Sequence, residues 1–194
     1  MNVSAIVMAS GMSRRMNKNK LLMKLKDRQI FVYILDTINK CDFYDKTVVA
    51  KDEEILQKSS LLGFHAVKNT EYENGQSRSV ILGVQKSKEA DGYMFFVADQ
   101  PLVSVETVKL MLESFEKNPC CIIVPRCKDK MRNPVIFPHW LKEELLMLSK
   151  DNGGKAVIVN NKDKIVFVDT DREYEFLDID TIEDYENVSK KVER

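Results

Sequence analysis

The sequence has few of the residues that build disulfide frameworks or zinc sites. Its four cysteines are irregularly spaced and form no C-x-x-C pair, so a disulfide scaffold is not the basis of the fold. It has only two histidines, His65 and His139, and a Cys/His zinc site is therefore not predicted. Neither histidine lies in a recognisable motif, so we do not expect histidine to carry the chemistry.

No charge of one sign dominates the chain. Thirty Lys and Arg residues balance thirty Asp and Glu residues, which argues against a general nucleic-acid binder, because such a protein needs a basic excess. No apolar run approaches the roughly 20 residues of a membrane span. The mostly apolar residues 1–9 are followed by Arg14 and Arg15, unlike a cleaved leader. We expect a protein of the reducing cytoplasm without nucleic-acid or membrane partners.

Short apolar segments alternate with helical patterns along the 194 residues, a length typical of one domain covering residues 1–194. Strands are predicted at residues 3–8, 46–50, 64–67, 93–98, 121–124, 135–137, 165–168 and 176–179. Helices are predicted at residues 30–41, 52–62, around 80–84, and at 105–115, 140–148, 155–160 and 181–192. This alternation indicates an α/β sandwich with a mostly parallel sheet, in which ligands bind beyond the carboxyl ends of the strands.

A basic loop follows the first predicted strand. Residues 9–19 (ASGMSRRMNKN) contain one glycine, Gly11, and residues 14–20 contain four cations. Backbone N–H groups beside a glycine, together with Arg and Lys, suit a triphosphate. The loop matches neither G-x-G-x-x-G nor G-x-x-x-x-G-K-[ST]. A solvated surface loop would have the same composition.

Carboxylates stand at two further strand ends. Asp99 ends the most apolar predicted strand, where a carboxylate can hold a hard divalent cation through oxygen. Asp178 lies in the predicted strand at 176–179 and Asp180 directly after it, and alternation puts them on one face if that strand is extended. Capping offers a simpler account, because Asp180 or Thr181 could begin the last helix with Asp184 near the capping-box position.

The combination of these features resembles the nucleotidyltransferases, and most closely the molybdenum cofactor cytidylyltransferase group of the MobA-like NTP transferases. That group opens with L-A-A-G-x-S-x-R-M-G-x-x-K, from which Ser10 and Asn17 depart here. The matching segments are 8–20 (MASGMSRRMNKNK), 75–79 (GQSRS), 99–103 (DQPLV), 133–137 (NPVIF), 150–154 (KDNGG) and 178–185 (DIDTIEDY). The fold that this resemblance implies is a Rossmann-like three-layer sandwich of the nucleotide-diphospho-sugar transferase type.

The resemblance also implies roles for residues. Arg15 and Lys20 would hold the β- and γ-phosphates and act as catalytic residues, and Arg14 would be a rim charge of the nucleotide site. Asp99, catalytic as well as nucleotide-binding, would hold Mg²⁺ with Asp180. The alternative that Asp178 is the second ligand stays open.

Two further groups of residues would contact the substrates. Those expected at the nucleotide base are Ala9, Ser10, Gly11, Gly75 and Ser79. Those expected at the acceptor are Asn133, Asp151, Gly153 and Gly154.

The implied reaction joins CMP from CTP to the terminal phosphate of molybdopterin and releases pyrophosphate. The substrates would then be a nucleoside triphosphate and a phosphorylated pterin, with Mg²⁺ as cofactor and a molybdoenzyme or its chaperone as a transient partner. One alternative is a nucleotidyltransferase with another nucleotide or with a sugar or polyol phosphate as acceptor. Another is a nucleotide-binding module for cofactor delivery without catalysis.

Overall fold

The structure, a computed structural model, describes residues 1–12, 19–149 and 153–192. Its strands are β1 (Val3–Ala9), β2 (Lys24–Leu25), β3 (Arg28–Gln29), β4 (Asp45–Ala50), β5 (His65–Lys68), β6 (Gly92–Val97), β7 (Ile122–Cys127), β8 (Lys130–Met131), β9 (Val135–Pro138) and β10 (Ile165–Asp169). Its α-helices are α1 (Ile30–Asn39), α2 (Glu53–Leu61), α3 (Gln76–Lys86), α4 (Val105–Lys117), α5 (Lys142–Leu146), α6 (Gly154–Asn160) and α7 (Ile182–Val192).

One large sheet has the strand order β10-β7-β9-β6-β1-β4-β5, and β8 pairs with β7 at its side. The central strand β1 is parallel to both β4 and β6, and β5 and β10 are parallel to their neighbours β4 and β7. Strand β9 runs antiparallel between β6 and β7. The prediction of a mostly parallel sheet is therefore confirmed.

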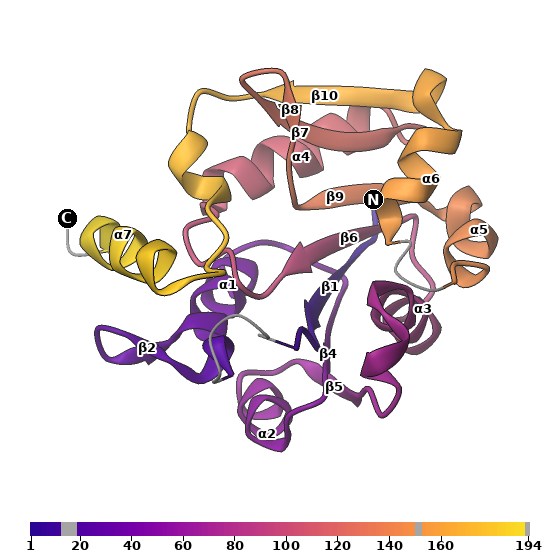
Figure 1. The fold of residues 1–194 in the computed structure, drawn as a ribbon. Helices are drawn as coiled ribbons and strands as arrows, with labels where there is room; N and C mark the ends of the chain where they lie inside the picture. Colours follow the sequence, from indigo (N-terminus) through magenta and orange to yellow (C-terminus); the bar gives the residue numbers. More distant parts are fainter. Residues whose placement is uncertain (13–18, 150–152, 193–194) are drawn as a thin grey trace.

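Helices cover both faces of this sheet and make a three-layer sandwich (Figure 1). Alternate residues of β1 point to opposite faces, as the strand period of two requires. Ala5 and Val7 join a core with α1, α4 and α7, whereas Ile6 joins a second core with α3, α5 and α6. Burial on both faces explains why the central strands are almost continuously apolar.

The strand predicted at residues 176–179 is wrong. A 3-10 helix at Glu173–Phe176 precedes an extended segment that joins no sheet. The buried carboxylate of Glu175 accepts a hydrogen bond from the backbone N–H of Ser104 at 3.1 Å, and the N–H of Ile179 donates to the carbonyl of Asp99 at 3.1 Å. These contacts carry the segment across the end of β6, where it cannot extend the sheet.

The helix predicted at residues 140–148 is shorter than expected. A 3-10 helix at His139–Leu141 leads into α5, which has only five residues. Trp140 is 49% exposed and donates a hydrogen bond to the carbonyl of Cys120. Among the helices that the structure describes, none has the length and apolar character needed to cross a bilayer.

Candidate active site

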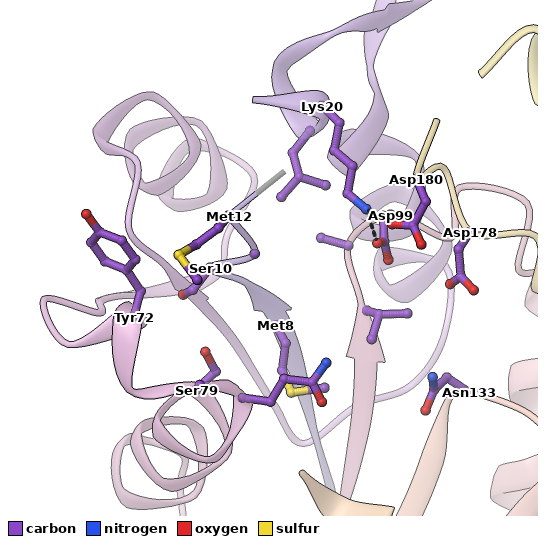
Figure 2. A pocket seen from close by; sticks show the side chains of 16 residues that line it. Met8, Ser10, Met12, Lys20, Tyr72, Ser79, Asp99, Asn133, Asp178 and Asp180 are labelled. Carbon is purple, nitrogen blue, oxygen red and sulfur yellow. Dashed lines mark hydrogen bonds and ion pairs between the residues drawn. The ribbon is translucent and has the colours of Figure 1, made fainter. Parts of the chain in front are cut away.

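A cleft of about 750 Å³ opens at the carboxyl ends of β1 and β6. Figure 2 shows Tyr72, Ser10 and Ser79 on one side of it and three aspartates with Asn133 on the other. Its lining residues are Met8, Ser10, Gly11, Met12, Lys20, Leu21, Tyr72, Gly75, Gln76, Ser79, Val97, Ala98, Asp99, Asn133, Asp178 and Asp180. The location agrees with the rule for ligand sites in sheets of this kind.

The ammonium of Lys20 lies between two carboxylates in this cleft. Its Nζ is 2.6 Å from Oδ2 of Asp99 and 2.8 Å from Oδ1 of Asp180 (Figure 2). The Lys20 side chain is only 9% exposed, whereas that of Asp180 is 38% exposed. The three residues are far apart in the sequence, and the fold brings together the two acids that the sequence analysis paired.

Local hydrogen bonds fix the backbone beside Lys20 and Asp180. Lys20 begins a 3-10 helix, Lys20–Leu22, which Asn19 caps by accepting a hydrogen bond from the N–H of Leu21 at 3.2 Å. Thr181 and Asp184 form reciprocal capping bonds, with the N–H of Thr181 donating to Asp184 Oδ2 at 2.8 Å and the N–H of Asp184 donating to Thr181 Oγ1 at 3.1 Å. The capping box expected at the last helix therefore begins one residue after Asp180.

The charges in this part of the cleft act strongly on one another. Burial is the largest single influence on Lys20 and lowers its pKa, but the charges and hydrogen bonds of Asp99 and Asp180 together raise the pKa above its ordinary value. Burial, followed by the charge of Asp99, raises the pKa of Asp178. Gln100 donates a hydrogen bond to Asp178 Oδ1 at 2.9 Å and partly opposes this shift. Three carboxylates and one ammonium make this wall acidic.

The donor set on this wall fits Mg²⁺. Within residues 1–12, 19–149 and 153–192, no cluster of three His, Cys, Asp or Glu side chains could hold a metal ion by itself. Two aspartates nevertheless converge on one point, at the Lys20 ammonium. Mg²⁺ is commonly bound by one or two carboxylates, with substrate phosphates and water completing its octahedron. Asp99 and Asp180 could therefore hold the ion, with phosphate oxygens and water as its further ligands.

The opposite wall is neutral and polar. Ser10 is buried, and its hydroxyl donates to the carbonyl of Val49 at 3.2 Å. Ser79, in the first turn of α3, accepts a hydrogen bond from Nδ2 of Asn69 at 3.2 Å. Ala9, predicted to lie at the base, is buried and is not among the residues that line the cleft.

Two glycines on this wall differ in what they contribute. A Cβ atom at Gly11 would meet nothing within 4 Å, so the described structure itself does not require glycine there. Gly75, directly before α3, has φ 89° and ψ −172°, a conformation that is essentially restricted to glycine. Gly75 is thus needed by the backbone, whereas Gly11 leaves open space at the mouth of the cleft.

The predicted acceptor residues are distributed unevenly. Asn133 lines the cleft (Figure 2). Gly153 packs against Gln76, because a Cβ atom added at Gly153 would lie only 2.7 Å from the Gln76 amide oxygen. Gly154 packs on the ring of Phe137. Neither glycine lines the cleft itself. Arg14, Arg15 and Asp151 lie outside the described residues.

Several lining residues were missed by the sequence analysis. Met8 and Met12 line the cleft, although neither was named as a candidate site residue (Figure 2). Tyr72 also lines it, with the ammonium of Lys51 4.7 Å from its ring centroid. The one sequence feature that could have indicated these residues as part of the site is their location in or beside the predicted loops.

The fold and the cleft define an α/β, Rossmann-like protein of the nucleotide-diphospho-sugar transferase type. The structure of Rv0371c from Mycobacterium tuberculosis H37Rv in complex with manganese matches with a TM-score of 0.77 at 21% identity, over 98% of this chain and 99% of that one. The MobA-like NTP transferase domain matches residues 5–165. The chain therefore belongs to the MobA-like NTP transferase family.

Curated relatives of this chain carry different names. A protein of Natranaerobius thermophilus named "Probable molybdenum cofactor guanylyltransferase" is 29% identical over 126 residues, which are 64% of this chain and 60% of that protein. A 2-C-methyl-D-erythritol 4-phosphate cytidylyltransferase of Lachnoclostridium phytofermentans is 30% identical over 138 residues, 67% of this chain and 59% of the relative. The chain thus spans about 60% of the length of these two relatives.

Proposed function

We propose that this chain, acting as one catalytic domain over residues 1–194, is a nucleotidyltransferase. In the proposed reaction, a terminal phosphate oxygen of a small acceptor attacks the α-phosphorus of a nucleoside triphosphate. A new P–O bond forms, the bond to the β-phosphate oxygen breaks, and pyrophosphate leaves. The observation that carries this proposal is the Lys20 ammonium held between Asp99 and Asp180 in a 750 Å³ cleft at the strand ends.

The chemistry needs no general base. A phosphate monoester has its second pKa near about 6, so the attacking oxygen is already ionised at neutral pH. The barrier is then the approach of two anions, and catalysis consists of positioning and charge neutralisation. This requirement fits a cleft whose described lining contains aspartate, lysine, serine and asparagine but no histidine.

Each part of the cleft has a proposed role. Lys20, with Arg15 and Arg14 of the basic loop, binds the triphosphate oxygens. Asp99 and Asp180 hold Mg²⁺, which when bound neutralises charge at the α-phosphate. Asn133 faces the acceptor, and Asp151 belongs to the same side in this proposal.

The remaining roles fall to small residues. Backbone groups at Ser10 and Gly11 bind the base together with Gly75 and Ser79. The turn that contains Gly153 and Gly154 supports the acceptor through its contact with Gln76.

For the substrates, we propose CTP and molybdopterin, with CMP joined to the terminal phosphate of the pterin. The resemblance of residues 8–20 and 178–185 to the motifs of the molybdenum cofactor cytidylyltransferase group supports this assignment. GTP is the second candidate, because the relative from Natranaerobius thermophilus is named as a guanylyltransferase. A sugar or polyol phosphate acceptor is the third, since another relative is named for methylerythritol phosphate. With molybdopterin as acceptor, a molybdoenzyme or its chaperone would receive the product.

The decisive experiment is mass spectrometry of the product. The protein is incubated with Mg²⁺, molybdopterin and each of CTP, GTP and UTP in turn, and pyrophosphate release is followed in parallel. We expect a cytidylylated pterin from CTP. A product formed only from GTP would replace the first assignment by the second candidate. Unchanged nucleotide with every acceptor, including methylerythritol phosphate, would favour a delivery module without catalysis.

A further inference from the structure

The Lys20 ammonium occupies the point on which the two proposed metal ligands converge. Its Nζ contacts Asp99 Oδ2 at 2.6 Å and Asp180 Oδ1 at 2.8 Å. These are the distances of strong charge-assisted hydrogen bonds, and the Lys20 side chain is almost completely buried. A divalent ion bound by the same two oxygens would lie within a few ångströms of this ammonium.

We infer that Lys20 acts as a stand-in for the metal until the nucleotide arrives, so that the protein takes up its divalent cation together with the triphosphate and not before it. This inference rests on the proposed function. Without nucleotide, the ammonium neutralises the carboxylates and holds the end of β6 close to the segment before α7. With nucleotide, Lys20 transfers to phosphate oxygens and leaves Asp99 and Asp180 to the cation.

Charge explains why the two steps are coupled. Two positive charges a few ångströms apart repel each other strongly in a partly buried site, where the effective dielectric constant is well below that of water. A divalent cation that enters alone must therefore overcome repulsion from Lys20, which already occupies the carboxylates of Asp99 and Asp180. The triphosphate supplies anionic oxygens for both cations at once. Lys20 consequently opposes binding of the metal alone and favours binding of the metal with nucleotide.

The test is a single substitution with two opposite effects. In Lys20→Met, we expect the affinity for Mn²⁺ alone to rise at least about tenfold, because a positive charge has been removed from between the carboxylates. The affinity for CTP or GTP at saturating Mn²⁺ should fall at least about tenfold, because a phosphate ligand has been lost. Isothermal titration calorimetry and Mn²⁺ electron paramagnetic resonance measure both quantities.

Two control variants separate this role from others. Lys142→Met removes a lysine whose Nζ lies 2.7 Å from Glu89 in an exposed ion pair, and it should change neither affinity. Lys20→Arg keeps the charge and should leave the weak affinity for Mn²⁺ alone nearly unchanged. If Lys20→Met binds Mn²⁺ alone no more tightly than the wild type, the inference is overturned, and Lys20 is a phosphate ligand or a structural residue only.

A measurement on the wild type keeps the inference testable if Lys20→Met does not fold. The side-chain ammonium signal of Lys20, assigned by comparison with Lys20→Arg, is followed by ¹H–¹⁵N NMR. We expect it to persist with millimolar Mg²⁺ and to shift when CTP or GTP is added with Mg²⁺. A shift with Mg²⁺ alone would contradict the inference. Absence of nucleotide binding would contradict the proposed function instead. The titration with Mn²⁺ alone would still test whether Lys20 opposes binding of a cation by Asp99 and Asp180.

Discussion

Gly83 is the position at which helix α3 approaches the central strand β1. A Cβ atom at Gly83 would overlap Cγ2 of Ile6 and lie 3.5 Å from its Cδ1. Ile6 is fully buried and is held on both sides by strand pairing, opposite Thr47 and Phe95. The side chain cannot move away without disturbing the second core. Substitution of Gly83 by alanine must therefore push α3 away from the sheet.

The expected cost follows from two opposing effects. Overpacking of a filled core costs about 1–3 kcal/mol, whereas alanine in place of glycine inside a helix gains about 1 kcal/mol. Gly83→Ala should thus lose up to about 2 kcal/mol of the free energy of unfolding. Ile6→Ala alone should lose about 2–5 kcal/mol. In the double variant the new methyl group fills part of the cavity, so the combined loss should be smaller than the sum by at least about 1 kcal/mol.

Urea denaturation of the four proteins measures this coupling. Gly83→Ala combined with Val188→Ala, on the opposite face of the sheet, is the control and should be additive. The affinity for nucleotide should also fall in Gly83→Ala, because the first turn of α3 brings Gln76 and Ser79 into the cleft. Additivity of Gly83→Ala with Ile6→Ala to within about 0.5 kcal/mol would refute the packing argument.

Three other predictions concern the cleft and its borders. Asp99→Asn should reduce pyrophosphate release by about a hundredfold or more with an unchanged circular dichroism spectrum, and near-normal turnover would show the metal assignment to be wrong. Gly11→Ala should weaken nucleotide binding at unchanged thermal stability, whereas Gly75→Ala should also lose about 1–3 kcal/mol because of its positive φ; equal melting temperatures of these two variants would contradict this. The hydrogen bond from Thr181 lowers the pKa of Asp184. The stability that the ionised Asp184 carboxylate contributes is therefore present above about pH 4 and is lost as the pH falls through the folded-state pKa of Asp184. Urea unfolding between about pH 5 and pH 3 should therefore depend less on pH in Asp184→Asn than in the wild type.

The central part of the fold could be predicted because burial on two faces leaves a strong pattern. Residues 3–8 and 93–98 are apolar at nearly every position, and they became the adjacent strands β1 and β6. The edge and crossing segments carry no such pattern. At residues 176–179 the side chains of Phe176 and Ile179 are buried, but they pack across the strand end instead of joining the sheet. The spacing of apolar residues predicts that a segment is buried, but it does not predict with which strand, if any, the backbone of that segment pairs.

The site could be predicted in part. The resemblance of residues 99–103 (DQPLV) and 178–185 (DIDTIEDY) to family motifs implied the pairing of Asp99 with Asp180, and in the structure both contact Lys20. The expected extended strand was not the cause of this convergence, since Ile179 reaches Asp99 through one backbone hydrogen bond. Met8 and Met12 could not be distinguished from core methionines, because an apolar side chain has the same sequence signature in a core and in a cleft wall.

If the proposed function is correct, the charges of the cleft should make the basic loop and the metal depend on each other. Lys20 faces Asp99 and Asp180, and Asp178 adds a third carboxylate, so this wall by itself repels a triphosphate. The wall that carries Ser10 and Ser79 is neutral and offers hydrogen bonds but no countercharge. Under the proposed function, we therefore expect the cationic residues among 14–18 and a divalent ion to supply countercharge in addition to Lys20. If the chain acts on a triphosphate, we expect binding to weaken when either source of positive charge is removed.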